Sequence, residues 1–132
     1  DQTAALWDAA SGRRLFRLAG QQAPVTAAAF SPDGRFAITG GDTGDPTVRL
    51  WDLRTGQTLM TFWGHAAGVR GLSFSADGRH FASAGADGAA QVYDCNVCGS
   101  LDDLLALAPS HVTRELTAEE RQKYLYELAV RR

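Results

Sequence analysis

The chain repeats itself at an offset of 44 residues, and this repeat constrains its fold more than any other feature. The pair Trp7-Asp8 returns as Trp51-Asp52, and Tyr93-Asp94 follows 42 residues later. The second interval is shorter because the first copy carries extra residues around 42–44. A fixed period of this length indicates a repeat architecture. The matching residues are Gly20, Val25, Phe30, Ser31, Asp33, Gly34 and Arg35 in the first copy, and Gly64, Val69, Phe74, Ser75, Asp77, Gly78 and Arg79 in the second.

Each copy predicts a series of short strands joined by tight turns. The turns carry Ser-x-Asp-Gly at 31–34 and 75–78, where Asp bonds nearby backbone and Gly accepts a positive φ. Four short strands in a unit of roughly 40–45 residues is the spacing of a propeller blade. We therefore expect an all-β fold. The expected strands are 4–8, 14–18, 25–30, 36–40, 47–52, 57–63, 69–74, 80–84 and 89–94.

The sequence resembles the WD-repeat family over about residues 1–94, because Gly64-His65, the two Ser-x-Asp-Gly turns and Trp51-Asp52 occur together at the repeat spacing. The resemblance implies a partial WD-repeat β-propeller of about two and a half four-stranded antiparallel blades, with a short C-terminal α-helical tail. It also implies a non-catalytic protein-interaction or scaffold module rather than an enzyme. The segments would be the end of one blade at 1–18, a full blade at 19–63, a three-stranded last blade at 64–94 and a helical extension at 95–132.

The number of blades leaves the propeller incomplete, because closed propellers typically hold about four to eight. The remaining blades would come from the same longer chain or from other copies of this one. We favour the longer chain, of which this sequence would be the C-terminal part. The last unit stops after its third strand, as in propellers whose last blade takes a strand from the other end of the chain.

The resemblance also implies a side-chain hydrogen-bond network inside each blade. It links a His before the first strand, a Ser or Thr on the second, an Asp in the next turn and a Trp on the third. Gln21 stands at the His position of one copy and Tyr93 at the Trp position of the other. Either Asp45 or Asp42 could be the Asp of the first copy. A His-Asp-Ser set also occurs in hydrolases, but its fixed place in the repeat favours a structural role. The positions are His65, Ser83, Asp87 and Tyr93 in one copy, and Gln21, Thr39, Asp45 and Trp51 in the other.

The tail predicts two helices, one at about 101–108 that ends before Pro109, and one that begins at Thr117 with a capping box. Its sequence from Leu101 to Leu125 resembles the ending of WD-repeat regions in large bacterial signalling proteins. The resemblance implies a place in a bacterial signalling or regulatory protein. The alternative is a sensory or regulatory domain of an enzyme or transcriptional regulator whose active module lies upstream.

Cys95 and Cys98 have the spacing of half a zinc site. A complete site needs further ligands, and His65 is assigned to the blade network. We therefore expect two reduced thiols in a connector and no metal. A zinc site and a redox or local disulfide pair are the alternatives.

Charge and motifs narrow the function classes. The net charge is −2, which gives no reason to expect nucleic acid or an anionic membrane as partner. The sequence has no phosphate-binding loop and no nucleophile-elbow motif, so we expect no cofactor. A cytoplasmic location is the default expectation. Arg13, Arg14 and Arg17 form a small basic group that we expect to be solvated, or alternatively to meet an acidic patch.

The expected partner is a protein or peptide. Propellers generally bind partners on the face that carries the loops before the first strand and between the second and third strands. The loop around 41–46 is the most distinctive, because only one copy has it at this length. The candidate contact residues are Gln22, Asp42, Thr43, Trp63 and Ala66.

Overall fold

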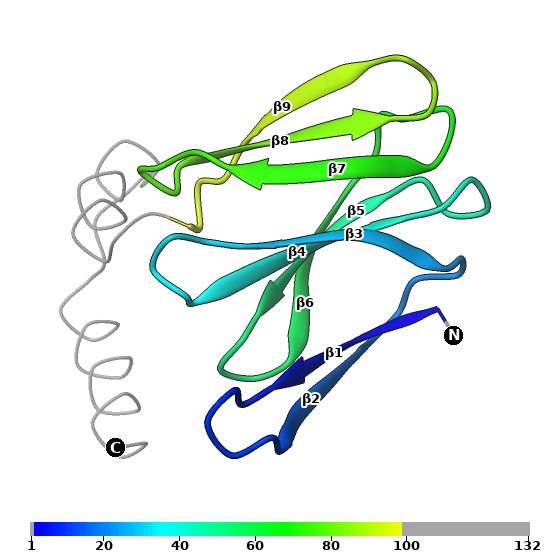
Figure 1. Cartoon of the computed structure of the whole chain (residues 1–132). Coiled ribbons are helices and arrows are strands. Elements are labelled where there is room, and N and C mark those ends of the chain that lie inside the picture. Colours follow the sequence, from blue (N-terminus) through cyan, green and yellow to red (C-terminus); the bar gives the residue numbers. More distant parts are fainter. Residues whose placement is uncertain (1, 99–132) are drawn as a thin grey trace, which may run out of the picture. The chain divides into compact units, whose positions relative to one another are not determined.

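The computed structural model describes residues 2–98, which form nine strands in three antiparallel sheets (Figure 1). The first sheet pairs β1 with β2, the second has the order β3-β4-β5-β6, and the third has the order β7-β8-β9. This arrangement confirms the predicted all-β, partial propeller fold. The strands are β1 (Thr3–Trp7), β2 (Arg14–Ala19), β3 (Val25–Phe30), β4 (Phe36–Gly41), β5 (Val48–Asp52), β6 (Gln57–Phe62), β7 (Val69–Phe74), β8 (His80–Gly85) and β9 (Ala90–Asp94).

The predicted tail helices at 101–108 and from Thr117 lie outside the described residues, and the division into 1–94 and 95–132 stays a prediction. The described residues contain no helix, so none of them supplies a helical membrane span.

The two Ser-x-Asp-Gly turns are built alike and set the β3–β4 and β7–β8 hairpins. In the second turn, the Ser75 hydroxyl donates to Asp77 Oδ1 at 2.5 Å and accepts from the His80 backbone N–H at 3.0 Å. Gly78 closes the turn with a φ of 70°, a left-handed conformation that glycine adopts without strain. The turn sequence therefore fixes which residues of the two strands face each other.

The second and third sheets pack face to face around the main hydrophobic core. β7 lies beside β3 and β4, so the sheets meet along their first strands (Figure 1). Ile38 and Leu50 of the second sheet are fully buried against Val69 and Phe81 of the third. The Phe81 ring lies 4.9 Å from that of Phe62, edge to face. Burial of this apolar surface is the main force that stacks one repeat on the next.

Gly40 allows the two sheets to approach closely. A Cβ atom at this position would lie 2.5 Å from Val69 Cγ1 and 2.7 Å from Val69 Cβ. The contact is reinforced by the Thr26 hydroxyl, which donates to the Val69 carbonyl at 2.5 Å. The stack therefore depends on a residue without a side chain at this point of β4.

Candidate functional site

His65 and Asp87 form a hydrogen-bonded cluster at one end of the third sheet. Asp87 Oδ2 accepts from the Ala66 backbone N–H at 2.8 Å, and Oδ1 accepts from the Ala89 N–H at 3.0 Å. His65 Nδ1 lies 3.1 Å from Asp87 Oδ2, and Nε2 lies 2.7 Å from Ser83 Oγ. The cluster thus joins the loop before β7, the strand β8 and the loop before β9.

The protonation of this cluster follows from its partners. The Asp87 carboxylate only accepts hydrogen bonds, so Nδ1 of neutral His65 carries the proton and donates to it. Nε2 is then an acceptor, and the Ser83 hydroxyl donates to it. This is the order of a hydrolase triad, but the side chain of His65 is 1% exposed and Ser83 is 2% exposed. A substrate has no access to the hydroxyl, so the geometry supports a structural role.

The first copy keeps the aspartate cap but bonds its other members differently. Asp45 Oδ2 accepts from the Gln22 N–H at 2.8 Å, matching Asp87 and Ala66, so Asp45 rather than Asp42 holds the equivalent place. Gln21 does not reproduce the histidine, because its Nε2 donates to the Thr47 carbonyl at 3.3 Å. The Trp51 indole N–H donates to the buried Thr39 hydroxyl at 2.9 Å, the link that the resemblance implies.

The assignment of Tyr93 to the network is wrong. Its hydroxyl donates to Gln91 Oε1 at 3.2 Å, and Gln91 Nε2 in turn donates to the Gly64 carbonyl. Ser83 is bonded by His65 instead. Gln91 lies two residues before Tyr93 on the same face of β9, where its side chain accepts the hydrogen bond from the hydroxyl. The third sheet therefore keeps the bonds of His to Asp and Ser from the expected network, and the second sheet keeps the bond between Trp and Thr.

Replacing Trp51 with phenylalanine should destabilise the chain by about 1–3 kcal/mol, because the buried Thr39 hydroxyl would lose its donor and the smaller ring would leave a gap. The matched change Tyr93→Phe should cost less, since Gln91 is partly exposed and can turn to water. Urea unfolding of both variants measures the two effects. Equal losses in the free energy of unfolding would contradict a specific stabilising role for the bond between the Trp51 indole and the Thr39 hydroxyl.

The Asp87 carboxylate predicts acid sensitivity. Hydrogen bonds from the Ala66 and Ala89 backbone N–H groups lower the pKa of Asp87 from 3.8 to about 2. A folded-state pKa below the unfolded value gives stability that is present above pH 3.8 and is lost as the pH falls toward 2. The stability difference between the wild type and Asp87→Asn should therefore be constant near neutral pH and shrink through this window. Urea unfolding at a series of pH values measures it, with Asp94→Asn, an exposed carboxylate, as the control. A difference that persisted unchanged to pH 2 would contradict this assignment.

The loops before β3 and β5 of the second sheet and before β7 and β9 of the third sheet lie at the same end of these sheets. Asp45 and Asp87, which accept the backbone hydrogen bonds described above, lie in two of these loops. The 42–45 loop reaches the third sheet, where Asp42 Oδ1 lies 3.3 Å from Arg70 Nη2, and Thr43 Oγ1 accepts from the Gly68 N–H at 3.4 Å. The Ala86 N–H donates to the Gly68 carbonyl at 2.8 Å. These bonds hold loops from two repeats in one surface. We call this surface the loop end; its exposed or half-exposed residues include Gln22, Asp42, Thr43, Trp63, Ala66 and Arg70.

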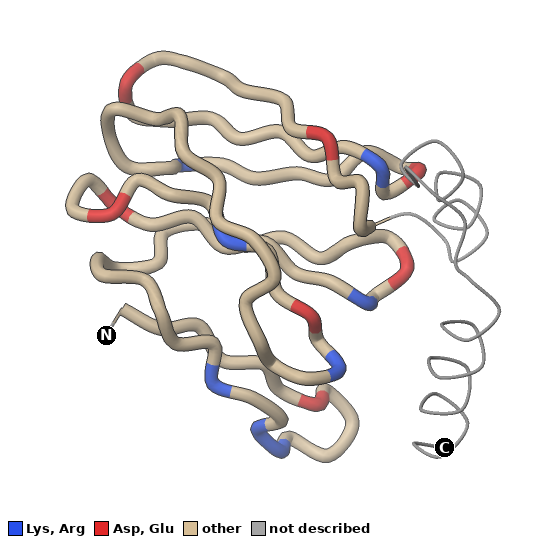
Figure 2. The backbone as a smooth tube through the Cα atoms, turned by 180° about the vertical axis from the view of Figure 1, so that it is seen from behind, with Lys and Arg blue, Asp and Glu red and all other residues tan. Residues whose placement is uncertain are grey.

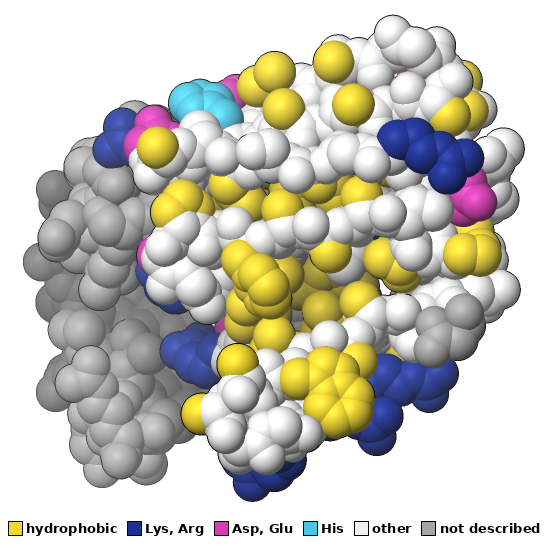
Figure 3. All heavy atoms as spheres, in the orientation of Figure 1, with side chains coloured by type: hydrophobic (Ala, Val, Ile, Leu, Met, Phe, Trp, Pro, Cys, Tyr) yellow, Lys and Arg dark blue, Asp and Glu magenta, His cyan; other side chains and the backbone are white. Residues whose placement is uncertain are grey.

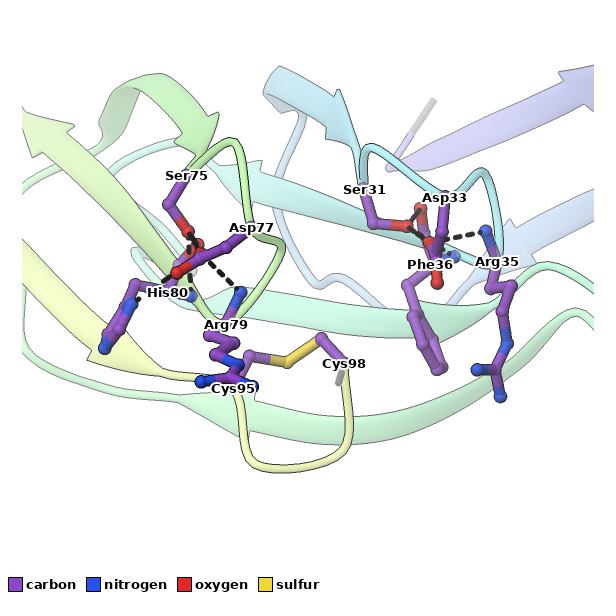
Figure 4. The surroundings of a disulfide bond; sticks show 10 residues. All are labelled: Ser31, Asp33, Arg35, Phe36, Ser75, Asp77, Arg79, His80, Cys95 and Cys98. Carbon is purple, nitrogen blue, oxygen red and sulfur yellow. Dashed lines mark hydrogen bonds and ion pairs between the residues drawn. A yellow bond between two sulfur atoms is a disulfide. The ribbon is translucent and has the colours of Figure 1, made fainter. Parts of the chain in front are cut away.

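Cys95 and Cys98 are joined by a disulfide bond (Figure 4). The expectation of two reduced thiols is therefore wrong, and the local disulfide alternative describes the structure. The turn after β9 brings their Cα atoms to 5.2 Å, within the range that a disulfide spans. Both residues are buried beside Phe36 in the core. Between residues 2 and 98 the structure holds no group of three or more His, Cys, Asp or Glu side chains placed to bind a metal.

Sequence reasoning missed Gln91, Thr47 and Arg70. Gln91 could have been predicted from the alternation of side chains along a strand. Residues two apart in β9 share a face, and Gln91 lies two residues before Tyr93. Thr47 holds the same place before Trp51 as Ala89 before Tyr93, and its hydroxyl donates to Asp45 at 2.7 Å. Arg70 and Asp42 belong to different sheets and lie far apart in the sequence. No local sequence pattern therefore predicts their contact.

Comparison with known proteins identifies two repeats. The family model described as "WD domain, G-beta repeat" matches residues 12–52 and 56–94. The two matches run from β2 to β5 and from β6 to β9, so each sequence repeat begins with the last strand of one sheet and continues into the next. No curated protein matches the chain.

Proposed function

Because the chain belongs to the WD-repeat family, we propose that it is a non-catalytic interaction scaffold that binds a protein or peptide partner at its loop end. WD repeats generally mediate protein–protein interaction. The observation that carries the proposal is the bonding of loops from two repeats into one surface by Asp42, Thr43, Arg70 and Gly68. Preorganised loops reduce the entropy lost when a partner binds.

The composition of the loop end fits a protein partner. Trp63 is 72% exposed, and aromatic side chains contribute strongly to protein interfaces. Gln22, Thr43 and Ala66 are also exposed in these loops, and the ion pair of Asp42 with Arg70 adds polar groups. The net charge of −2 favours neither nucleic acid nor a membrane as partner.

The wider setting is proposed from the sequence. The tail resemblance supports a place in a larger, bacterial, cytoplasmic signalling or regulatory protein. The other blades would come from the same longer chain or from other copies. A sensory or regulatory domain attached to an enzyme or transcriptional regulator is the second candidate; it differs in that an active module elsewhere responds when the loop end is occupied.

Photocrosslinking from a single site tests the loop-end proposal. A photoreactive phenylalanine analogue replaces exposed Gln22 at the loop end, which keeps the bonds between the loops, and in the control replaces exposed Thr55 in the turn after β5. A defined protein should crosslink from position 22 and not from 55. Its purified form should bind the chain, and Trp63→Ala should weaken that binding at least about tenfold. Equal crosslinking from both sites, or binding that is indifferent to Trp63, would overturn the proposal.

The metal or redox alternative at the cysteine pair has its own test. The disulfide occupies both sulfur atoms, so a metal would require its reduction. Metal analysis and thiol titration, with and without reductant, separate the states. Disulfides persist mainly in oxidising compartments, so alkylation of the thiols in intact cells also tests the cytoplasmic proposal. We expect loop-end binding to be unchanged when both cysteines are replaced by serine, and a lost affinity would favour the redox alternative.

A further inference from the structure

β6 is the edge strand of the second sheet. It pairs with β5 on one side, and no strand among residues 2–98 pairs with its other side. The second sheet has the four strands of a whole blade and meets the third sheet through β3, so this edge lies at the far side of the sheet. Along the chain, β6 lies between two described strands, β5 and β7. An edge strand presents a row of unpaired backbone N–H and C=O groups.

The first four residues of β6 are open on both faces of the strand. Gln57, Thr58, Leu59 and Met60 are all exposed, and successive side chains of a strand point to opposite faces. Leu59 and Met60 are each 44% exposed. Figure 3 shows apolar side chains at the surface in this region. An incoming strand therefore has access to the backbone of β6.

β6 also lacks the charges of the corresponding strand in the first sheet. At the offset of 44 residues, Arg14 and Arg17 of β2 correspond to Thr58 and Thr61 of β6. β6 has no charged residue and no proline. In Figure 2 the basic positions gather at the β1–β2 hairpin. Charged side chains on an edge strand discourage pairing with another chain, so β2 is protected in this way and β6 is not.

A difference in strand regularity does not separate β2 from β6. A β-bulge also makes an edge less suited to pairing. The pairing of β1 with β2 shifts register between Leu6 and Trp7, and that of β5 with β6 shifts at the equivalent place, between Leu50 and Trp51. Since both strands share this feature, their charges are what distinguishes them.

The sequence of β6 suits pairing with a second copy of itself. In an antiparallel pair centred on Met60, Thr58 lies opposite Phe62 of the second copy, and Leu59 lies opposite its Thr61. Aromatic side chains opposite β-branched ones stabilise strand pairs, and no like charges face each other. The same pair built from β2 would crowd two arginines of each copy together.

We propose that the β6 strands of two copies pair edge to edge, in antiparallel orientation, and form a symmetric dimer. The contact joins the same surface of both copies, so it closes on itself and does not grow into a filament. It uses the backbone of β6, whereas the proposed protein or peptide partner binds the loops of the loop end. Either interaction can therefore fail without the other.

Placing the charges of β2 on β6 tests this pairing. In sedimentation equilibrium, the wild type should pass from a mass of 14.1 kDa to about twice that mass as concentration rises, and no further. The double variant Thr58→Arg, Thr61→Arg should stay a monomer, because the pair would bring together two positive charges from each copy. The matched control Thr58→Val, Thr61→Val adds no charge and should dimerise like the wild type.

Amide hydrogen exchange of the wild type shows where the copies meet. The backbone N–H groups of β6 should exchange more slowly as the chain associates, and those of β2 should not. Circular dichroism should show the same β-sheet content in the wild type and both double variants. A wild type that stays monomeric at every concentration, a folded arginine variant that dimerises like it, a folded valine variant that stays monomeric, or a dimer whose β6 amides gain no protection would each overturn the proposal.

Discussion

Replacing Phe81 with alanine is expected to destabilise the chain by about 3–5 kcal/mol, the usual cost of deleting a buried phenylalanine ring. Phe81 is 1% exposed, and its ring contacts Phe62 and Tyr93, each at 4.9 Å between centroids. It therefore joins β6 of the second sheet to the third sheet. A loss of this size is a large share of the stability of a small domain. Urea unfolding followed by circular dichroism measures it.

Phe30→Ala is the matched control for this prediction. Phe30 is also a strand phenylalanine, but it is 63% exposed, so its removal should change stability by less than about 1 kcal/mol. Similar losses for the two variants would show that the ring cluster of Phe81 is not the centre of the core.

Replacing Gly40 with alanine is expected to cost about 1–3 kcal/mol or more, although alanine normally suits a strand better than glycine. The new Cβ would lie 2.5 Å from Val69 Cγ1, so β4 and β7 must separate. The double variant Gly40→Ala with Val69→Ala should recover part of the loss, because the clash partner is gone. Thermal unfolding of the two single variants and the double variant gives the coupling.

Gly71→Ala provides the comparison, because a Cβ there would meet only Ala84 Cβ at 3.8 Å, an ordinary contact. It should be neutral or slightly stabilising. A Gly40→Ala chain as stable as Gly71→Ala would mean that the sheets do not approach at this glycine.

The strands were predictable because their signals are local. The Ser-x-Asp-Gly turns set both hairpins, and β3 and β7 have the predicted bounds. β1 begins at Thr3 rather than Ala4, a difference of the kind that strand ends show, since their pairing depends on a partner strand. The choice of Asp45 over Asp42 needed the structure, because the longer loop shifts the register and only the bond to the Gln22 N–H decides it.

The side-chain partners were harder to predict, because they depend on which groups compete for one donor. The Tyr93 hydroxyl donates to Gln91 and not to Ser83, and the Gln21 amide donates to the Thr47 carbonyl. The prediction of two reduced thiols at Cys95 and Cys98 was wrong because their spacing alone also fits a half zinc site and a local disulfide. Only the fold of that turn brings the two sulfur atoms together.

The central claim is that matching sheets from successive repeats stack directly, with β7 against β4. Proton–proton nuclear Overhauser effects in solution test it most directly. The methyl groups of Val69 should show effects to the α protons of Gly40, since a Cβ at Gly40 would lie 2.5 Å from Val69 Cγ1. A spectrum that shows the contacts within each sheet but none between Gly40 and Val69 would contradict the account.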